Sequence, residues 1–264
     1  MIEFFLNFLP EKSPFLNLFS YLSTRTILAT LTGLIIVIFC GDYFIKKIRS
    51  LQFKQSIGDR GPESHKAKDG TPTMGGLLVV GAVIFSGLLW GDLNSKYILI
   101  SLFCLISFGL IGFVDDYKKI QEKNSKGISS QTKLFYQFIA ACAISIALFM
   151  TASSEAEYSY IVPFFKDVFL DFGFWFVFIS IFILVGSSNA VNLTDGLDGL
   201  AILPVIIITA ALGVIAWASG NVIAADYLYI PFVEGTGELL VLCGAMVGAG
   251  TVSYTHLRAH ETKS

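Results

Sequence analysis

Long apolar runs, separated by shorter polar segments, dominate this sequence. Seven of them approach the ~20 residues that a helix needs to cross a bilayer, and they lie at about 24–45, 74–90, 97–114, 134–150, 172–188, 199–218 and 238–250. The runs are apolar on every face, whereas the strands of a membrane barrel alternate. Lipid offers no partner for unpaired backbone groups, so helices are the expected spanning element. The pattern predicts an all-α fold, a polytopic transmembrane helical bundle.

Composition supports a membrane protein. Of the 264 residues, 54% are hydrophobic and 14% charged, whereas a soluble domain carries roughly a quarter charged residues. The cysteines lie inside apolar runs without CxxC spacing, which predicts buried small side chains rather than a zinc site or disulfides: Cys40, Cys104, Cys142 and Cys243. The net charge of −2 says nothing useful about partners. No nucleic-acid partner is predicted.

Lysine and arginine are divided unequally between alternate connections. Twelve follow the first and third runs: Lys46, Lys47, Arg49, Lys54, Arg60, Lys66, Lys68, Lys118, Lys119, Lys123, Lys126 and Lys133. The connections of opposite parity carry four: Lys12, Arg25, Lys96 and Lys166. Because basic loops stay in the cytoplasm, the first group is expected there. Counting spans then places residues 189–200 in the cytoplasm too.

Three polar segments on that side are candidates for a site. The first, GPESHKAKDGTPTMGG at 61–76, is rich in Gly and Pro and is therefore expected to form turns. His65 and Lys68 can meet an anion, and Thr73 can donate a hydrogen bond. The alternative is a solvated, turn-rich loop whose basic residues follow only the preference of Lys and Arg for cytoplasmic loops.

The second segment is the pair Asp115 and Asp116, directly after LISFGLIGFV. Two carboxylates at the end of a span are costly unless they are paired or bind a metal. Neighbouring positions point about 100° apart on a helix, so one carboxylate can hold a divalent ion while the other acts as a base. The alternative is an acidic pair neutralised by Lys118 and Lys119.

The third segment, SSNAVNLTDGLDGL, holds four Asn and Asp side chains: Asn189, Asn192, Asp195 and Asp198. Spacings of three residues bring side chains onto neighbouring positions of a helix. Hard oxygen ligands are those that Mg²⁺ takes, commonly together with substrate phosphates. A polar turn between two helices is the alternative. Together, the three segments predict Mg²⁺-assisted chemistry on a phosphate or diphosphate at the bilayer surface. They do not identify the substrate.

At these residues the sequence resembles a known family. The runs GPESHKAKDGTPTMGG, GFVDDYKKI and NAVNLTDGLDGLA are similar to those of the phospho-N-acetylmuramoyl-pentapeptide-transferases, over about residues 20–250. The resemblance implies transfer of phospho-MurNAc-pentapeptide from UDP-MurNAc-pentapeptide to undecaprenyl phosphate, giving lipid I and UMP. It also implies Mg²⁺ as cofactor and a multi-pass location in the bacterial inner membrane with a cytoplasmic site. It leaves a homodimer open.

The resemblance assigns roles residue by residue. Asp115 would deprotonate or orient the lipid phosphate, with support from Asp116, and Lys133 would contact phosphates. The remaining motif residues would serve the nucleotide or the metal. Lys68 and Thr73 would line the nucleotide end, His65 would help shape that loop, and Asp198 would lie near the uracil. Asn189, Asn192 and Asp195 would serve the metal–diphosphate region, with Asn189 as a substrate-binding residue.

The C-terminal part departs from the family pattern. Members have ten spans, and the third acidic residue that they use for Mg²⁺ lies in an MGDTGS-like segment that this sequence lacks. We therefore expect residues 1–250 to form an incomplete membrane transferase domain and residues 251–264, TVSYTHLRAHETKS, to be an atypical, non-native tail. The expectation that follows is a chain without transferase activity.

Other functions remain open at this point. A polyprenyl-phosphate GlcNAc-1-phosphate transferase shares the aspartates, although TPTMGG argues against it. An intramembrane prenyltransferase would need a second aspartate-rich motif, for which DDYKKI is a poor substitute. A transporter or scaffold is disfavoured, because transporters place ionisable groups near the bilayer midplane and these acids lie at span ends.

Overall fold

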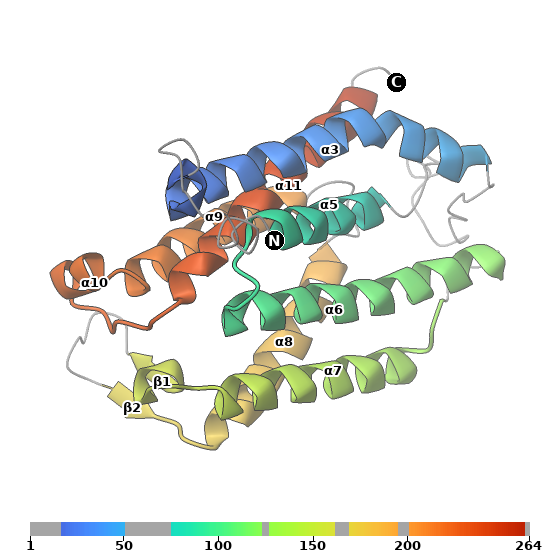
Figure 1. Ribbon diagram of the computed structural model, residues 1–264. Coiled ribbons are helices and arrows are strands. Elements are labelled where there is room, and N and C mark those ends of the chain that lie inside the picture. The colour runs from blue at the N-terminus through green and yellow to red at the C-terminus, as the bar shows by residue number, and fades with distance from the viewer. Residues whose placement is uncertain (1–16, 51–74, 123–126, 162–168, 195–200, 262–264) are drawn as a thin grey trace.

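The computed structural model describes residues 17–50, 75–122, 127–161, 169–194 and 201–261 (Figure 1). Seven apolar helices lie within these ranges: α3 (Leu22–Ser50), α5 (Gly75–Trp90), α6 (Lys96–Gln121), α7 (Ser130–Met150), α8 (Trp175–Thr194), α9 (Ile202–Ser219) and α11 (Leu239–Glu261). Five are long and apolar enough to cross a membrane, whereas α5 and the apolar part of α11 are shorter. Each coincides with a predicted run, so the all-α membrane fold is confirmed.

The helix ends differ from the predicted ends where the chain leaves the apolar run. α3 continues to Ser50 and α6 to Gln121, beyond the expected ends near 45 and 114. Hydropathy marks only the apolar part of a helix, and polar turns continue the same backbone hydrogen bonding. α11 runs to Glu261, so the predicted boundary at 250 is not a helix end. The assignment of 251–264 as a separate tail stays a prediction.

Successive apolar helices run in opposite directions, as Figure 1 shows. The end of α6 therefore lies beside the start of α7 on one side of the bundle, while the start of α6 and the end of α7 lie on the other. From Lys96 to Asp115 α6 rises about 29 Å, at ~1.5 Å per residue. That length matches the roughly 30 Å of the hydrocarbon core.

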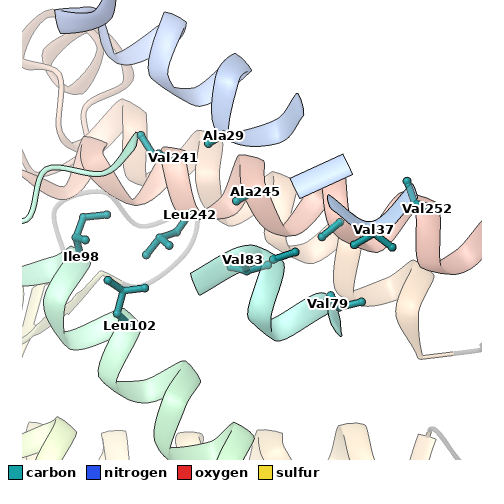
Figure 2. Close-up of a cluster of buried hydrophobic side chains, with 12 residues drawn as sticks. Ala29, Val37, Val79, Val83, Ile98, Leu102, Val241, Leu242, Ala245 and Val252 are labelled. Atoms are coloured by element: carbon teal, nitrogen blue, oxygen red, sulfur yellow. The ribbon is translucent and has the colours of Figure 1, made fainter. Parts of the chain in front are cut away.

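The core is centred on α11, which packs against α3, α5 and α9. Its buried members come from α3, α5, α6 and α11 (Figure 2). Close approach of α3 and α11 depends on small residues: a Cβ added at Gly33 would lie 2.7 Å from the carbonyl oxygen of Ala245, and one at Gly248 would overlap the carbonyl of Thr30. α7 and α8 lie outside this core and are joined to it through α6, which packs against α5 and α11 as well as α7.

Two charged clusters tie the helices together at the end opposite Asp115. Arg25 on α3 donates two hydrogen bonds to Glu238, at 2.7 and 2.6 Å, and one to the carbonyl of Trp90 at the end of α5. Lys96 and Tyr97 at the start of α6 both hydrogen bond to Glu157 at 2.7 Å. These contacts fix the connections on this side of the bundle.

Short elements complete the connections on the same side. β1 (Ser159–Ile161) pairs antiparallel with β2 (Phe169–Asp171), with Tyr160 opposite Leu170. This hairpin was not predicted, since three-residue strands leave no periodic signal. Short helices make up the rest: η1 (Leu18–Ser20), η2 (Glu155–Glu157), α10 (Val222–Leu228) and η3 (Thr236–Glu238).

Candidate functional site

Asp115 forms the centre of a charged cluster where α6 leaves the bundle. Its Oδ2 lies 2.8 Å from the Nζ of Lys119, one turn along α6, and 3.7 Å from the Nζ of Lys133 on α7. Its Oδ1 accepts a hydrogen bond of 2.9 Å from the backbone N–H of Ile128. The side chain is only 9% exposed, and a buried carboxylate is stable there because three donors replace its water shell.

Gly127 makes the contact between the 127–128 backbone and Asp115 possible. Its φ of +58° lies in the left-handed region that favours glycine. A Cβ at this position would overlap the Oδ1 atom of Asp115 and lie 2.8 Å from the Cε of Lys119. The absence of a side chain therefore lets the loop approach the carboxylate. α7 begins just after it, with Ser129 as N-cap accepting from the N–H of Thr132.

Asp116 occupies a different environment from its neighbour. Its side chain is 38% exposed, and its Oδ1 lies 3.0 Å from the Nζ of Lys119. Lys119 thus bridges the two carboxylates, while Lys118 pairs with Glu122 at 3.6 Å. The prediction that lysines neutralise the acidic pair is right for Lys119, but Lys133 rather than Lys118 is the second partner. α7 brings Lys133 to Asp115, which sequence spacing alone does not show.

α7 extends the polar contacts from α6 to α8. Lys133 and Gln137 are four residues apart and so lie on the same face of the helix. Gln137 is 2% exposed. Its Oε1 accepts a hydrogen bond of 2.8 Å from the Nδ2 of Asn189, and its Nε2 donates one of 3.1 Å to the Oγ of Ser188. One face of α7 therefore contacts Asp115 at its start and Asn189 one turn further.

Asn189 and Asn192 lie near the C-terminal end of α8. Asn189 is half-buried, and its Nδ2 also donates a hydrogen bond of 2.8 Å to the carbonyl of Val185. Asn192 is exposed, three residues further along. The structure places Asn189 in contact with α7 and leaves Asn192 outside that contact. The other predicted site residues lie outside the described residues: His65, Lys68, Thr73, Asp195 and Asp198.

The predicted metal site is described only in part. Within the ranges that the structure describes, no group of three or more His, Cys, Asp or Glu side chains is arranged to hold a metal ion. The donors present are oxygen atoms of carboxylates and amides from Asp116, Asn189 and Asn192, and these are the atoms that Mg²⁺ takes as ligands. The donor set therefore fits Mg²⁺ in its chemistry. Mg²⁺ binding stays a prediction.

Comparison with known families bears on the chemistry of this site. The sequence model of glycosyl transferase family 4 matches residues 98–260, which is more than half of the chain and includes α7, α8, α9 and α6 from its third residue onward. The chain belongs to glycosyl transferase family 4. Membership makes it a phospho-sugar transferase that acts on polyprenyl phosphate with a nucleotide sugar. The prediction is thereby confirmed at the level of this superfamily, and the transporter, scaffold and prenyltransferase alternatives gain no support.

Sequence reasoning missed two residues that contact predicted site residues: Gly127 beside Asp115 and Gln137 beside Asn189. A glutamine inside an apolar run is a signal that can be found, because a buried amide needs partners on a neighbouring helix. Gly127 carries no such signal. A glycine in a polar loop is ordinary, and only the fold shows that it faces a carboxylate.

Proposed function

We propose that the reaction served by the site of this family 4 member is transfer of phospho-MurNAc-pentapeptide from UDP-MurNAc-pentapeptide to undecaprenyl phosphate, on the cytoplasmic face of the bacterial inner membrane. An oxygen of the lipid phosphate forms a bond to the sugar-linked phosphorus, and the bond from that phosphorus to UMP breaks. The products are lipid I and UMP. The reaction consumes no oxidant or reductant.

The cluster of Asp115, Asp116, Lys119 and Lys133 is the observation that carries this proposal. It lies at the end of α6 and the start of α7, about 29 Å along α6 from the opposite cluster at Lys96. A lipid phosphate resides at that depth, at the boundary between hydrocarbon and water. The choice of MurNAc-pentapeptide rests on the runs GPESHKAKDGTPTMGG and NAVNLTDGLDGLA.

The contacts favour different tasks for the two aspartates. Both oxygens of Asp115 are occupied by Lys119, Lys133 and the Ile128 N–H, so this carboxylate holds the two ammonium groups in place. Asp116 is the more exposed of the two and is the carboxylate available to a ligand. This division reverses the roles that the resemblance implies, in which Asp115 acts on the lipid phosphate.

Charge balance at the cluster accounts for the proposed cofactor. Two carboxylates and two ammonium groups sum to zero, so an incoming diphosphate brings negative charge that nothing in the cluster offsets. A Mg²⁺ ion held by Asp116, Asn192 and Asp195 would supply that positive charge to the phosphate oxygens. Lys119 and Lys133, held by Asp115, would orient the lipid phosphate.

A substrate comparison tests the proposal. The protein in detergent micelles or nanodiscs is titrated with UDP-MurNAc-pentapeptide, UDP-GlcNAc and UMP, and UMP release is then followed with undecaprenyl phosphate and Mg²⁺. We expect tighter binding of UDP-MurNAc-pentapeptide than of UDP-GlcNAc. Any lipid product should contain MurNAc-pentapeptide. Preference for UDP-GlcNAc in binding or transfer would replace the proposal by the GlcNAc-1-phosphate alternative.

A further inference from the structure

The orientation of the Asn189 amide is set by its neighbours. Its Nδ2 lies 2.8 Å from the carbonyl oxygen of Val185. A carbonyl can only accept, so the nitrogen and not the oxygen of the amide must face it. The second N–H of the same nitrogen reaches Oε1 of Gln137, also at 2.8 Å. Both amide hydrogens of Asn189 are therefore used within the protein.

Gln137 is fixed in turn by the same reasoning. With its Oε1 accepting from Asn189, its Nε2 faces the hydroxyl of Ser188 at 3.1 Å, and a hydroxyl can accept. Gln137 is 2% exposed, so water cannot compete for its amide. A reversed amide would bring two N–H groups of Gln137 and Asn189 together and leave a buried donor unsatisfied. The network thus permits one arrangement.

The atom of Asn189 left for a ligand is its carbonyl oxygen. In the described part of the chain Oδ1 accepts no hydrogen bond, and Asn189 is half-buried rather than enclosed. An oxygen held in this way attracts a positive partner and repels a phosphate. Asn192 lies three residues further on α8, a neighbouring position on the helix surface.

We infer that Gln137 is a positioning residue that turns the Oδ1 atom of Asn189 outward, so that Asn189 is an oxygen ligand of a divalent cation and not a phosphate contact. The inference rests on the proposed Mg²⁺-dependent transfer and narrows the expected role of Asn189 at the metal–diphosphate region to a contact with the cation. Oxygen ligands suit Mg²⁺ and Mn²⁺. A buried partner that orients a metal ligand typically changes metal affinity by about 10–100-fold when removed.

Binding of Mn²⁺ alone tests the inference, without nucleotide sugar or lipid phosphate. Electron paramagnetic resonance measures free Mn²⁺ during titration of the whole chain in micelles. We expect Asn189→Leu and Gln137→Leu each to weaken Mn²⁺ binding about tenfold. Asn189→Asp keeps an oxygen and adds negative charge but loses the N–H donors to Val185 and Gln137, so it should bind Mn²⁺ more tightly than Asn189→Leu. Gln131→Leu is the matched control, since Gln131 is exposed on the same helix.

Several outcomes would overturn the inference. They are absence of Mn²⁺ binding by the native chain, unchanged affinity in Asn189→Leu, equal affinities of Gln137→Leu and Gln131→Leu, or weaker binding by Asn189→Asp than by Asn189→Leu. If Gln137→Leu fails to fold, as circular dichroism would show, Gln137→Glu replaces it and should retain Mn²⁺ binding, because a glutamate oxygen still accepts from Asn189. Transfer of a different sugar would refute the proposed function and leave these affinities unaffected.

Discussion

At the scale of single residues, the environment of Asp115 explains why two adjacent aspartates are not equivalent. Three donors surround Asp115. Among the described residues, Asp116 has an ion pair only with Lys119, which also contacts Asp115, and Asp116 is more exposed. Adjacent positions on a helix point in different directions, so one carboxylate faces α7 and the 127–128 backbone. The other remains accessible. Single-residue changes that disturb Asp115 should therefore displace Lys119 and Lys133 and so weaken binding of the lipid phosphate.

Gly127→Ala should weaken binding of undecaprenyl phosphate and destabilise the protein. An alanine at φ +58° costs about 1–2 kcal/mol, and its Cβ would overlap Oδ1 of Asp115. The Ile128 hydrogen bond would then be lost. Gly112→Ala is the control, because nothing lies within 4 Å of a Cβ at this position on α6, and alanine favours helix by about 1 kcal/mol. Equal melting temperatures and lipid affinities of the two variants would contradict the prediction.

Lys133→Met should reduce affinity for undecaprenyl phosphate about tenfold or more, since loss of a charge-assisted contact costs roughly 1.5–3 kcal/mol. Lys133 is 17% exposed and lies beside Asp115. The matched change Lys118→Met should leave affinity unchanged, because Lys118 is 45% exposed and pairs with Glu122. Lipid titration monitored by tryptophan fluorescence measures both. The prediction fails if both variants lose affinity equally.

At the scale of elements, α7 has a bridging role that its apolar composition hides. It contacts α6 through Lys133 and α8 through Gln137, and its buried face continues with Ala141, Ile144 and Ser145. At the other end of the bundle, side chains at helix ends join α3, α5 and η3. These contacts determine how the helices are spaced around the site.

The Arg25–Glu238 pair should contribute strongly to stability. Arg25 is 4% exposed, and its Nη1 and Nη2 atoms both contact the carboxylate. Breaking such a pair from one side typically costs about 3–5 kcal/mol, because the remaining charge is buried without compensation. We expect this loss for Glu238→Leu and for Arg25→Leu, measured by unfolding in SDS or urea. The double variant should recover much of it, and a purely additive double loss would contradict this account.

The Glu157 cluster predicts a pH dependence of the connection between α7 and α8. Burial acts to raise the pKa of Glu157, but hydrogen bonds from Lys96, the Ser153 N–H and Tyr97 and the charge of Lys96 hold it below its ordinary value. A carboxyl with a lowered pKa adds stability above its unfolded pKa of about 4.3, and this stability is lost as pH falls through the lower folded value.

Hydrogen exchange of the 151–161 backbone should therefore be constant from about pH 5 to 7, after correction for intrinsic rates, and show increased opening below about pH 4. Glu157→Gln should open this segment at every pH and remove the dependence. Glu155→Gln serves as the control, since Glu155 is exposed. A pH dependence that persists in Glu157→Gln would assign the effect to another group.

At the scale of the whole molecule, the antiparallel course of the helices places the described parts of the site around Asp115 and Asn189 on one side. The end of α6 and the start of α7 lie on the side opposite the Lys96 and Arg25 clusters (Figure 1). Asn189 contacts Gln137 close to that start of α7. We propose that the site side is cytoplasmic, because in the sequence twelve Lys and Arg residues follow the first and third apolar runs and only four lie in the connections of opposite parity.

Cysteine labelling tests this orientation. Ser130→Cys and Ser153→Cys introduce exposed thiols at the two ends of α7, in a background without the four native cysteines. A membrane-impermeant maleimide should label Ser130→Cys in inside-out vesicles and Ser153→Cys in right-side-out vesicles. Labelling of both from the same side would contradict the topology, and the reverse pattern would place the site outside the cytoplasm.

The sequence by itself determined the membrane class, the seven apolar helices and the end of α6 at which the aspartates lie. Hydropathy decides these features because each span must satisfy its own backbone hydrogen bonds in lipid. The motifs also indicated a phospho-sugar transferase, and the family match agrees at that level. Spacing along one helix, which follows from local geometry, correctly suggested that Lys119 neutralises the aspartates.

Only the tertiary structure decided which side chains from different helices meet. Lys133 reaches Asp115, Gln137 orients Asn189, and Gly127 faces a carboxylate because α6, α7 and α8 pack with a particular rotation and spacing. Those quantities depend on close packing between helices, such as the approach of Gly33 to Ala245. No pattern along a single chain segment contains them, since a contact between helices is a property of two surfaces.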